Sequence, residues 1–251
     1  MTTTPFTVRR VETRDELQAA YRLRYQVYCQ EYGYLDPQRY ADGLESDEWD
    51  AHSVHFIVLT PDERMIATSR LIGDSERGLL IEQYVPLPPA TRGARFEVSR
   101  LTMSLEYRGH GNAIIHSLCK AMFDYSRSID IHTWFSTMFL GTWKLLLRFG
   151  IYFTLIGDPA FWPKGSSHIV APGLFDLRNA DIYLRHTHPD LCDFYYEGTD
   201  TNRGSARAAE VVAQSLRDRA LLNDFKSSFR VPLPTPRVAS FSTPAPTRIS
   251  A

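Results

Sequence analysis

Residues 94–126 read ARFEVSRLTMSLEYRGHGNAIIHSLCKAMFDYS, and this stretch predicts the centre of the fold. Apolar and polar residues alternate from Ala94 to Ser104, as in a half-buried β-strand, and from Ala113 to Ser126 the apolar residues recur at helical spacing. Between them lies Arg108-Gly109-His110-Gly111-Asn112. Its glycines let the backbone approach a ligand closely, and the helix that follows offers free amide groups to a phosphate. The stretch therefore predicts a strand, a pyrophosphate-binding loop and a helix, although a plain strand-to-helix turn is the alternative.

The segments on either side alternate between strand-like and helix-like patterns, with glycine, proline and aspartate between them. This order predicts an α/β (α+β) fold, with a mixed, mostly antiparallel central sheet flanked by helices. The expected elements are strands at 6–8, 53–60, 65–72, 131–137 and 151–156, helices at 12–28 and 140–149, and a long loop at 32–49.

The C-terminal part of the chain has a less regular pattern. Residues 159–196 predict an irregular cover over the core or an extra strand around 181–184. We expect one domain over residues 5–200, an appended amphipathic helix within 201–228, and a disordered Pro/Ser/Thr-rich tail over 229–251.

Bulk composition excludes several classes of protein. The formal net charge is −1 and the pI is about 6.7, so the whole molecule has no electrostatic attraction for nucleic acid. Three widely spaced cysteines favour a reducing compartment over a disulfide scaffold. The sequence shows no signal-peptide pattern and no apolar run long enough for a membrane span. We expect a cytoplasmic protein without an integral membrane segment.

Several charged residues stand beside apolar residues and should become partly buried. Burying a charge is costly unless the charge is paired or takes part in chemistry, so this set predicts an active site. For Glu97 the alternative is a structural ion pair with Arg70 or Arg100. A metal site with His52 and His55 is disfavoured, and we expect none. The candidate catalytic residues are Arg24, Asp47, Asp50, Arg70, Glu97 and Arg100.

Fragments around these residues resemble a known family. They are LRYQVY at 23–28, ESDEWDAHSVH at 45–55, SRL at 69–71 and EVSR at 97–100, together with the RGHG loop. In combination they resemble the GNAT acyltransferases, and within that superfamily the acyl-homoserine-lactone synthases and N-acyl amino acid synthases. The acyltransferases associated with PEP-CTERM/exosortase systems are the most similar group. The resemblance spans roughly residues 15–157.

The resemblance implies a role for each candidate. Glu97 would be the general base, and the three arginines with Asp47 and Asp50 would order the loop over the acceptor pocket. Backbone amides around Leu101, Thr102 and Met103 would polarise the donor carbonyl. Arg108, Gly109, His110, Gly111 and Asn112 would hold the pyrophosphate.

These roles predict an N-acyltransferase that moves a fatty acyl group from a pantetheine thioester to the amine of an amino acid or similar small acceptor. Acyl carrier protein is the preferred donor, and no permanently bound cofactor is expected. Many acetyltransferases of the superfamily carry a tyrosine four residues before the glycine of the last helix, where this chain has Leu146 before Gly150. The alternatives are an acyl-CoA-dependent acyltransferase and a non-catalytic module that binds acyl carrier protein.

Overall fold

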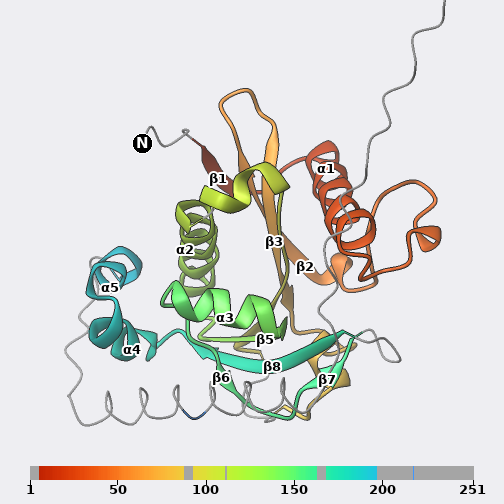
Figure 1. The fold of residues 1–251 in the computed structure, drawn as a ribbon. Coiled ribbons are helices and arrows are strands. Elements are labelled where there is room, and N and C mark those ends of the chain that lie inside the picture. The colour runs from red at the N-terminus through yellow and green to blue at the C-terminus, as the bar shows by residue number, and fades with distance from the viewer. Residues whose placement is uncertain (1–5, 88–92, 111, 163–167, 197–216, 218–251) are drawn as a thin grey trace, which may run out of the picture.

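The protein is described from a computed structural model, which covers residues 6–87, 93–110, 112–162, 168–196 and 217 (Figure 1). An eight-stranded sheet runs through it in the order β1-β2-β3-β4-β5-β8-β6, with β7 also paired to β8. Neighbouring strands are antiparallel except for β4 and β5. The strands are β1 Thr7–Arg10, β2 Ser53–Leu59, β3 Met65–Gly73, β4 Arg95–Met103, β5 Thr133–Phe139, β6 Thr154–Leu155, β7 Ala160–Phe161 and β8 Ile169–Asp176.

Helices cover both faces of this sheet, so the predicted GNAT-like architecture is confirmed (Figure 1). A capping box begins α1, in which Thr13 accepts a hydrogen bond from the amide of Glu16. The helices are α1 Arg14–Tyr25, α2 Asn112–Ser128, α3 Leu140–Arg148, α4 Ala180–Thr187 and α5 Pro189–Tyr196, and a π-helical turn at Gln26–Glu31 continues α1.

Strand β2 shows how the sequence assigns its two faces. Successive side chains of a strand point to opposite sides of the sheet. Phe56 and Val58 belong to the main core beneath α2, whereas Ile57 and Leu59 pack with Ala20 of α1 on the other face. Because all of these side chains are buried, the strand reads as a nearly continuous apolar run.

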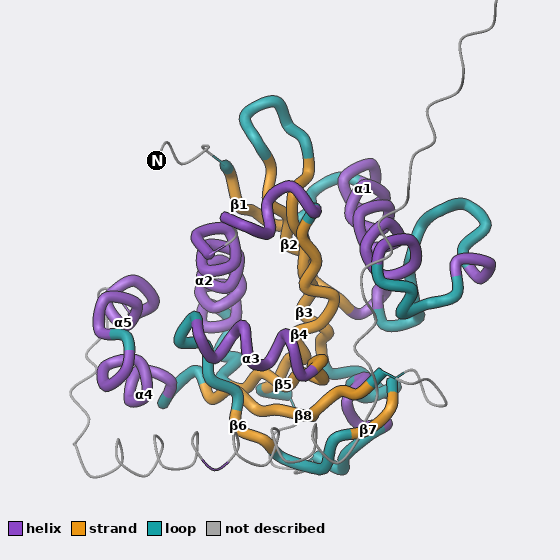
Figure 2. The backbone as a smooth tube through the Cα atoms, in the orientation of Figure 1, coloured by secondary structure: helices purple, strands orange, loops and turns teal. Residues whose placement is uncertain are grey.

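The loop predicted at 32–49 is present between α1 and β2, and Figure 2 shows it in teal, interrupted by a short helical turn. Its tyrosines pack against other parts of the chain. Tyr34 stacks on Phe139 of β5 with a centroid separation of 4.2 Å, and Tyr40 meets Tyr25 of α1 edge-on. The loop is therefore part of the packed structure.

The sheet opens where β4 and β5 part. These two strands pair only at Arg95–Thr133, Phe96–Trp134 and Glu97–Phe135. Beyond that point β4 continues beside β3, and β5 continues beside β8. The result is a V-shaped opening whose apex lies at Glu97.

The C-terminal region corrects two predictions. Residues 169–176 form β8, a full strand of the sheet rather than an irregular cover, and residues 181–184 lie in α4 rather than in a strand. The sequence did not predict β8, because Pro172 and Gly173 are uncommon inside strands and weaken the strand pattern. Within β8, Pro172 lies between the residues that pair with β7 and the residues that pair with β6. Nearby, the strand expected at 151–156 shortens to β6.

The predicted helix at 201–228 and tail at 229–251 lie outside the described residues, apart from Arg217, and stay predictions. Among the described helices, none is both long and apolar enough to span a bilayer.

Gly173 provides a test of this packing. A Cβ at Gly173 would lie 2.8 Å from Cζ3 of Trp143 and 3.0 Å from Cβ of Phe153. We expect Gly173→Ala to lower the free energy of unfolding by about 1–3 kcal/mol, measured by urea denaturation, because Trp143 is buried and has to shift. A Cβ at Gly141 in α3 would meet no atom within 4 Å, so Gly141→Ala is the matched control. Equal midpoints for the two variants would contradict this account.

Candidate active site

A pocket occupies the opening between β4 and β5. Its empty volume is about 830 Å³, part of which is open to solvent. The two strands contribute residues 97–101 and 136–139, and apolar side chains from the helices, among them Cys119, Met122 and Leu146, complete the walls. We call this space the central pocket. Its lining is mostly apolar, with a small number of polar side chains on β4, β5 and α3, which suits a largely apolar ligand.

Glu97 is the carboxylate at that apex. Its side chain is fully buried, and Oε2 accepts a hydrogen bond of 2.8 Å from the amide of Ile81. Oε1 has no hydrogen-bond partner within the described structure. Burial raises the pKa of Glu97 to about 7, although the Ile81 amide and the charges of Arg70 and Arg100 oppose this shift.

The ion-pair alternative for Glu97 can now be assessed. Within the described residues Glu97 lies in no salt bridge, because the carboxylates that pair with Arg70 and Arg100 come from the loop before β2. One oxygen of Glu97 therefore has no partner among the described residues beside the central pocket, and its pKa of about 7 allows both protonation states near neutral pH.

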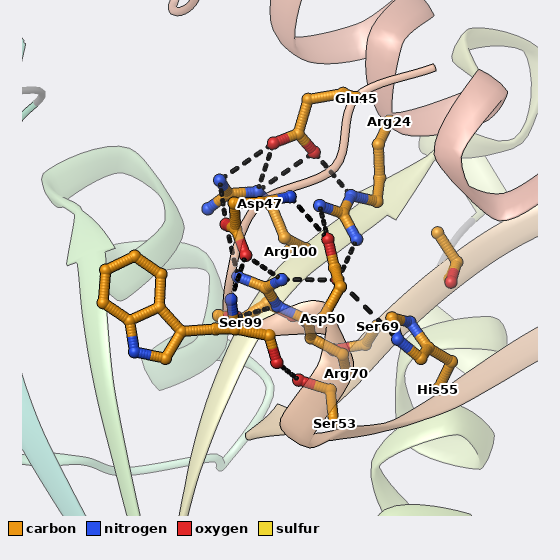
Figure 3. Close-up of polar contacts among 12 residues, drawn as sticks. Arg24, Glu45, Asp47, Asp50, Ser53, His55, Ser69, Arg70, Ser99 and Arg100 are labelled. Carbon is orange, nitrogen blue, oxygen red and sulfur yellow. Dashed lines mark hydrogen bonds and ion pairs between the residues drawn. The ribbon is translucent and has the colours of Figure 1, made fainter. Parts of the chain in front are cut away.

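Three arginines and three carboxylates form a buried network beside this pocket (Figure 3). Glu45 joins two of the arginines: its Oε2 lies 2.5 Å from Nε of Arg24, and its Oε1 lies 2.9 Å from Nη2 of Arg100. Neither Glu45 nor Arg24 has more than 1% of its surface exposed. The network thus ties α1, β4 and the loop before β2 together.

The second half of the network centres on Arg70 of β3. Its Nη1 and Nη2 donate to Asp47 at 2.6 and 2.8 Å, and Nη1 also donates to Asp50. Its Nε donates to the hydroxyl of Ser99 at 2.9 Å. Asp50 in turn receives two hydrogen bonds from Arg24. Three positive and three negative charges are therefore mutually balanced.

This balance fixes the protonation state of the carboxylates. Burial alone would raise the pKa of Glu45, but Arg100 and Arg24 outweigh burial and lower it to about 2. The pKa of Asp50 is likewise lowered to about 2, because Arg24 and Arg70 outweigh its burial. These groups stay ionised at neutral pH, in contrast to Glu97 on β4.

Arg100 lies at a bulge in β4. Arg70 is opposite Ser99 and Thr68 is opposite Thr102, so Arg100 and Leu101 together face the single residue Ser69. Arg100 has a φ of 56°, a left-handed conformation that is uncommon for a residue with a side chain. Its guanidinium lies 5.4 Å from the ring centroids of both Tyr28 and Trp162.

The bulge adjoins Leu101, Thr102 and Met103, the residues whose backbone amides the resemblance assigns to the donor carbonyl. Thr102 holds it through a 2.8 Å hydrogen bond from its hydroxyl to the carbonyl of Arg100. Of the three arginines, Arg100 is the one that lines the central pocket.

The predicted phosphate loop begins as a helical turn at Leu105–His110 before α2. Arg108 does not point away from the protein, as a free phosphate ligand would. Its guanidinium donates to the carbonyl of Met103, to the hydroxyl of Tyr32 and to Glu31. Gly109 is exposed, with no atom within 4 Å of the place a Cβ would take. Asn112 begins α2, the side chain of His110 is not described, and Gly111 lies outside the described residues.

The two histidines considered for a metal site are separated. His52 is exposed before β2, whereas His55 is buried on β2, 3.6 Å from Asp50. Burial lowers the pKa of His55 to about 4, which keeps the ring neutral. The described residues contain no group of three or more metal-binding side chains arranged around one point.

Sequence reasoning gave no role to Glu45, although it occurs two residues before Asp47 in the same acidic segment. Its position two residues before Asp47 is the sequence signal that could have identified Glu45 as a site residue. Pairing with two arginines at once could not be read from it, because Arg24 and Arg100 come from opposite sides of the loop in sequence.

The network predicts a stability effect. Asp50→Asn leaves Arg24 and Arg70 without a full counter-charge, so we expect the free energy of unfolding at pH 7 to fall by about 3–5 kcal/mol. Asp124→Asn is the control, because Asp124 pairs with Lys120 on the surface and its loss should cost less than about 1 kcal/mol.

The pH dependence follows from the lowered pKa values. Asp50 contributes stability above its ordinary pKa of 3.8, and this contribution disappears as the pH falls through about 2. Urea titrations across this acid range should show a steeper loss of stability for the native chain than for Asp50→Asn. Parallel curves would show that Asp50 is not coupled to the arginines.

Comparisons with known proteins agree with the geometry. Residues 23–116 match the family model of an acetyltransferase (GNAT) domain. A search of curated proteins gave no significant match. Among solved structures, the fold is similar to a CoA-dependent acyl-homoserine lactone synthase, BjaI, solved with SAM and isopentyl-CoA. The TM-score is 0.60 and the identity 21%, over 82% of this chain and 99% of that one.

Two further structures have the same fold. The acyl-homoserine lactone synthase LasI has a TM-score of 0.53 at 18% identity, over 71% of this chain and 95% of its own. FeeM, an N-acyl amino acid synthase from uncultured soil microbes, has a TM-score of 0.51 at 18% identity, over 71% and 94%. The described part of the chain therefore has a GNAT-like fold, and residues 23–116 carry the sequence pattern of a GNAT domain.

Proposed function

We propose that this protein is an N-acyltransferase that moves a fatty acyl group from a pantetheine thioester to the amine of an amino acid or a similar small acceptor. One observation carries the proposal: the buried carboxylate of Glu97, with one oxygen lacking a partner, lies at the apex of an apolar pocket. The GNAT-like fold and the similarity to structures of acyl-transferring synthases support it.

Glu97 supplies the base that such a reaction requires. The acceptor amine attacks the thioester carbonyl, its nitrogen forms the new C–N bond, and the C–S bond breaks. A base with a pKa near the working pH removes the proton from the attacking nitrogen most effectively. Glu97, with its pKa of about 7, accepts this proton. The leaving thiolate takes up one proton to become the thiol, so the neutral amine and the thioester give an amide and a thiol with no net change in protons.

The bulge in β4 is assigned to the binding of the thioester carbonyl of the donor. A register shift takes Arg100 and Leu101 out of the regular ladder with β3. We assign the backbone amides of Leu101, Thr102 and Met103 to the developing negative charge on the carbonyl oxygen. Leu146 lines the central pocket, so the position where many acetyltransferases carry a tyrosine offers no acid here.

The ion network orders the acceptor side of the site. Glu45, Asp47 and Asp50 all come from the loop before β2, and their arginine partners lie on α1, β3 and β4. The network holds this loop against the sheet. Arg100 also lines the central pocket, and we assign it to a carboxylate of the acceptor in addition to its bonds to Glu45 and Asp47.

The donor carries phosphopantetheine, either on acyl carrier protein or in acyl-CoA. Sequence resemblance favours acyl carrier protein. The similarity to BjaI, described as CoA-dependent, supports acyl-CoA as a second candidate. In either case the loop at residues 108–112 is the proposed phosphate site, and the Arg108 side chain fixes the start of this loop through Met103, Tyr32 and Glu31. The protein would hold no permanent cofactor, because the donor itself brings the reactive thioester.

A cytoplasmic location fits this chemistry, and the buried free thiols Cys29, Cys119 and Cys192 are compatible with it. The association with PEP-CTERM/exosortase systems stays a prediction from the sequence.

The donor assay tests the proposal. We expect purified protein, incubated with long-chain acyl carrier protein or acyl-CoA and a pooled amino-acid mixture, to form N-acyl products detectable by mass spectrometry. The donor that gives the higher rate of product formation identifies the carrier that the protein uses. Donor binding without any product from either donor would instead favour a non-catalytic binding module.

Glu97→Gln tests the base. We expect turnover to fall by about a hundredfold to ten-thousandfold, while donor binding and the unfolding midpoint are retained. For the native enzyme, kcat/KM should rise with pH through about 7 as Glu97 loses its proton, and this rise should be missing in Glu97→Gln. Glu106→Gln, on the surface, is the control. Full turnover by Glu97→Gln would remove the base from the mechanism.

A further inference from the structure

A second, smaller cavity lies behind the central pocket. It is a narrow space of about 10 Å³, lined by residues of α2, β5, β8 and the two C-terminal helices α4 and α5, which Figure 1 shows beside α2. We call it the rear cavity. Residues that line the rear cavity and not the central pocket include Phe123, Phe175, Leu184, Tyr195 and Tyr196.

The rear cavity is apolar even where tyrosines line it. The hydroxyl of Tyr195 lies 3.0 Å from Nδ1 of His116, and the hydroxyl of Tyr196 donates to the carbonyl of Leu177 at 2.7 Å. Both polar ends are thus satisfied by protein atoms, which leaves ring surface for the cavity wall. An apolar cavity of this kind favours hydrocarbon over water.

Three side chains separate the two spaces. Cys119 of α2, Trp134 of β5 and Ile151 after α3 line both the central pocket and the rear cavity. Trp134 is fixed, because its Nε1 donates to Ser126 at 2.9 Å and its ring stacks on Phe175. Cys119 is a neutral thiol, since burial raises its pKa to about 12. The partition is therefore apolar on both sides and one side chain thick.

We propose that Cys119, Trp134 and Ile151 end the acyl-binding part of the central pocket and so set the longest acyl chain that binds with full affinity. This inference rests on the proposed function, because it takes the occupant of the central pocket to be a fatty acyl chain. Each methylene that enters an apolar pocket tightens binding by about fourfold, or ~0.8 kcal/mol. A chain that reaches the partition gains nothing from further methylenes.

Opening the partition tests this. We would measure Kd by calorimetry for saturated acyl-pantetheines from hexanoyl to hexadecanoyl, since pantetheine is the arm shared by both candidate donors. For the native chain Kd should fall by about fourfold per methylene and then level off. In Ile151→Ala the space left by the lost side chain extends the central pocket into the rear cavity, so the levelling should move to slightly longer chains.

Two further variants make the result decisive. Leu184→Ala removes a similar side-chain volume from the wall of the rear cavity and leaves the partition intact. Its Kd series should therefore level off where the native series does. Cys119→Ala opens the partition from α2 with a smaller loss of packing, and it serves as the test if Ile151→Ala does not fold. An unchanged levelling point in a folded partition variant, or no binding of any acyl-pantetheine, would overturn the inference.

The proposed function can fail separately. If the levelling point shifts but no N-acyl product forms with any donor, the partition controls acyl binding in a protein that is not an acyltransferase. If products form and the levelling point does not shift, the enzyme stands and the partition does not set chain length.

Discussion

The site depends on a balance of buried charge. Three guanidinium groups and three carboxylates lie largely out of water beside the central pocket, and each is tolerated because the others neutralise it. Arg24, Arg70 and Arg100 come from a helix and two strands, whereas their partners come from one loop. Arginine suits this role, because its planar fork can bind two carboxylates at once and does not lose its charge.

The same balance explains why Glu97 behaves differently from its neighbours. Glu45 and Asp50 are buried with arginine partners and have lowered pKa values, while Glu97 is buried with only a backbone amide and has a raised one. If either neighbouring arginine were free, its charge would be drawn to Glu97 and would stabilise the ionised form. By engaging Arg70 and Arg100, the loop carboxylates leave Glu97 able to exchange a proton near neutral pH.

The geometry of the sheet places this carboxylate in the wall of the central pocket. Strands β4 and β5 pair for only three residues before they diverge, and Glu97 is the last paired residue of β4. Immediately beyond it the bulge at Arg100 changes the register with β3. One short interval of β4 therefore combines the proposed base, the opening between the strands and an irregular stretch of backbone.

The sequence by itself determined the order of the central elements and the candidate residues, because alternation, helical spacing and glycines are local signals. It did not reveal β8, where Pro172 and Gly173 obscure a strand that only the neighbouring strands stabilise. It also did not show that Glu45 joins two arginines or that Glu97 stays outside the network. Those facts depend on distances between segments far apart in the chain, so burial and pairing, and with them each pKa, were decided only by the tertiary structure.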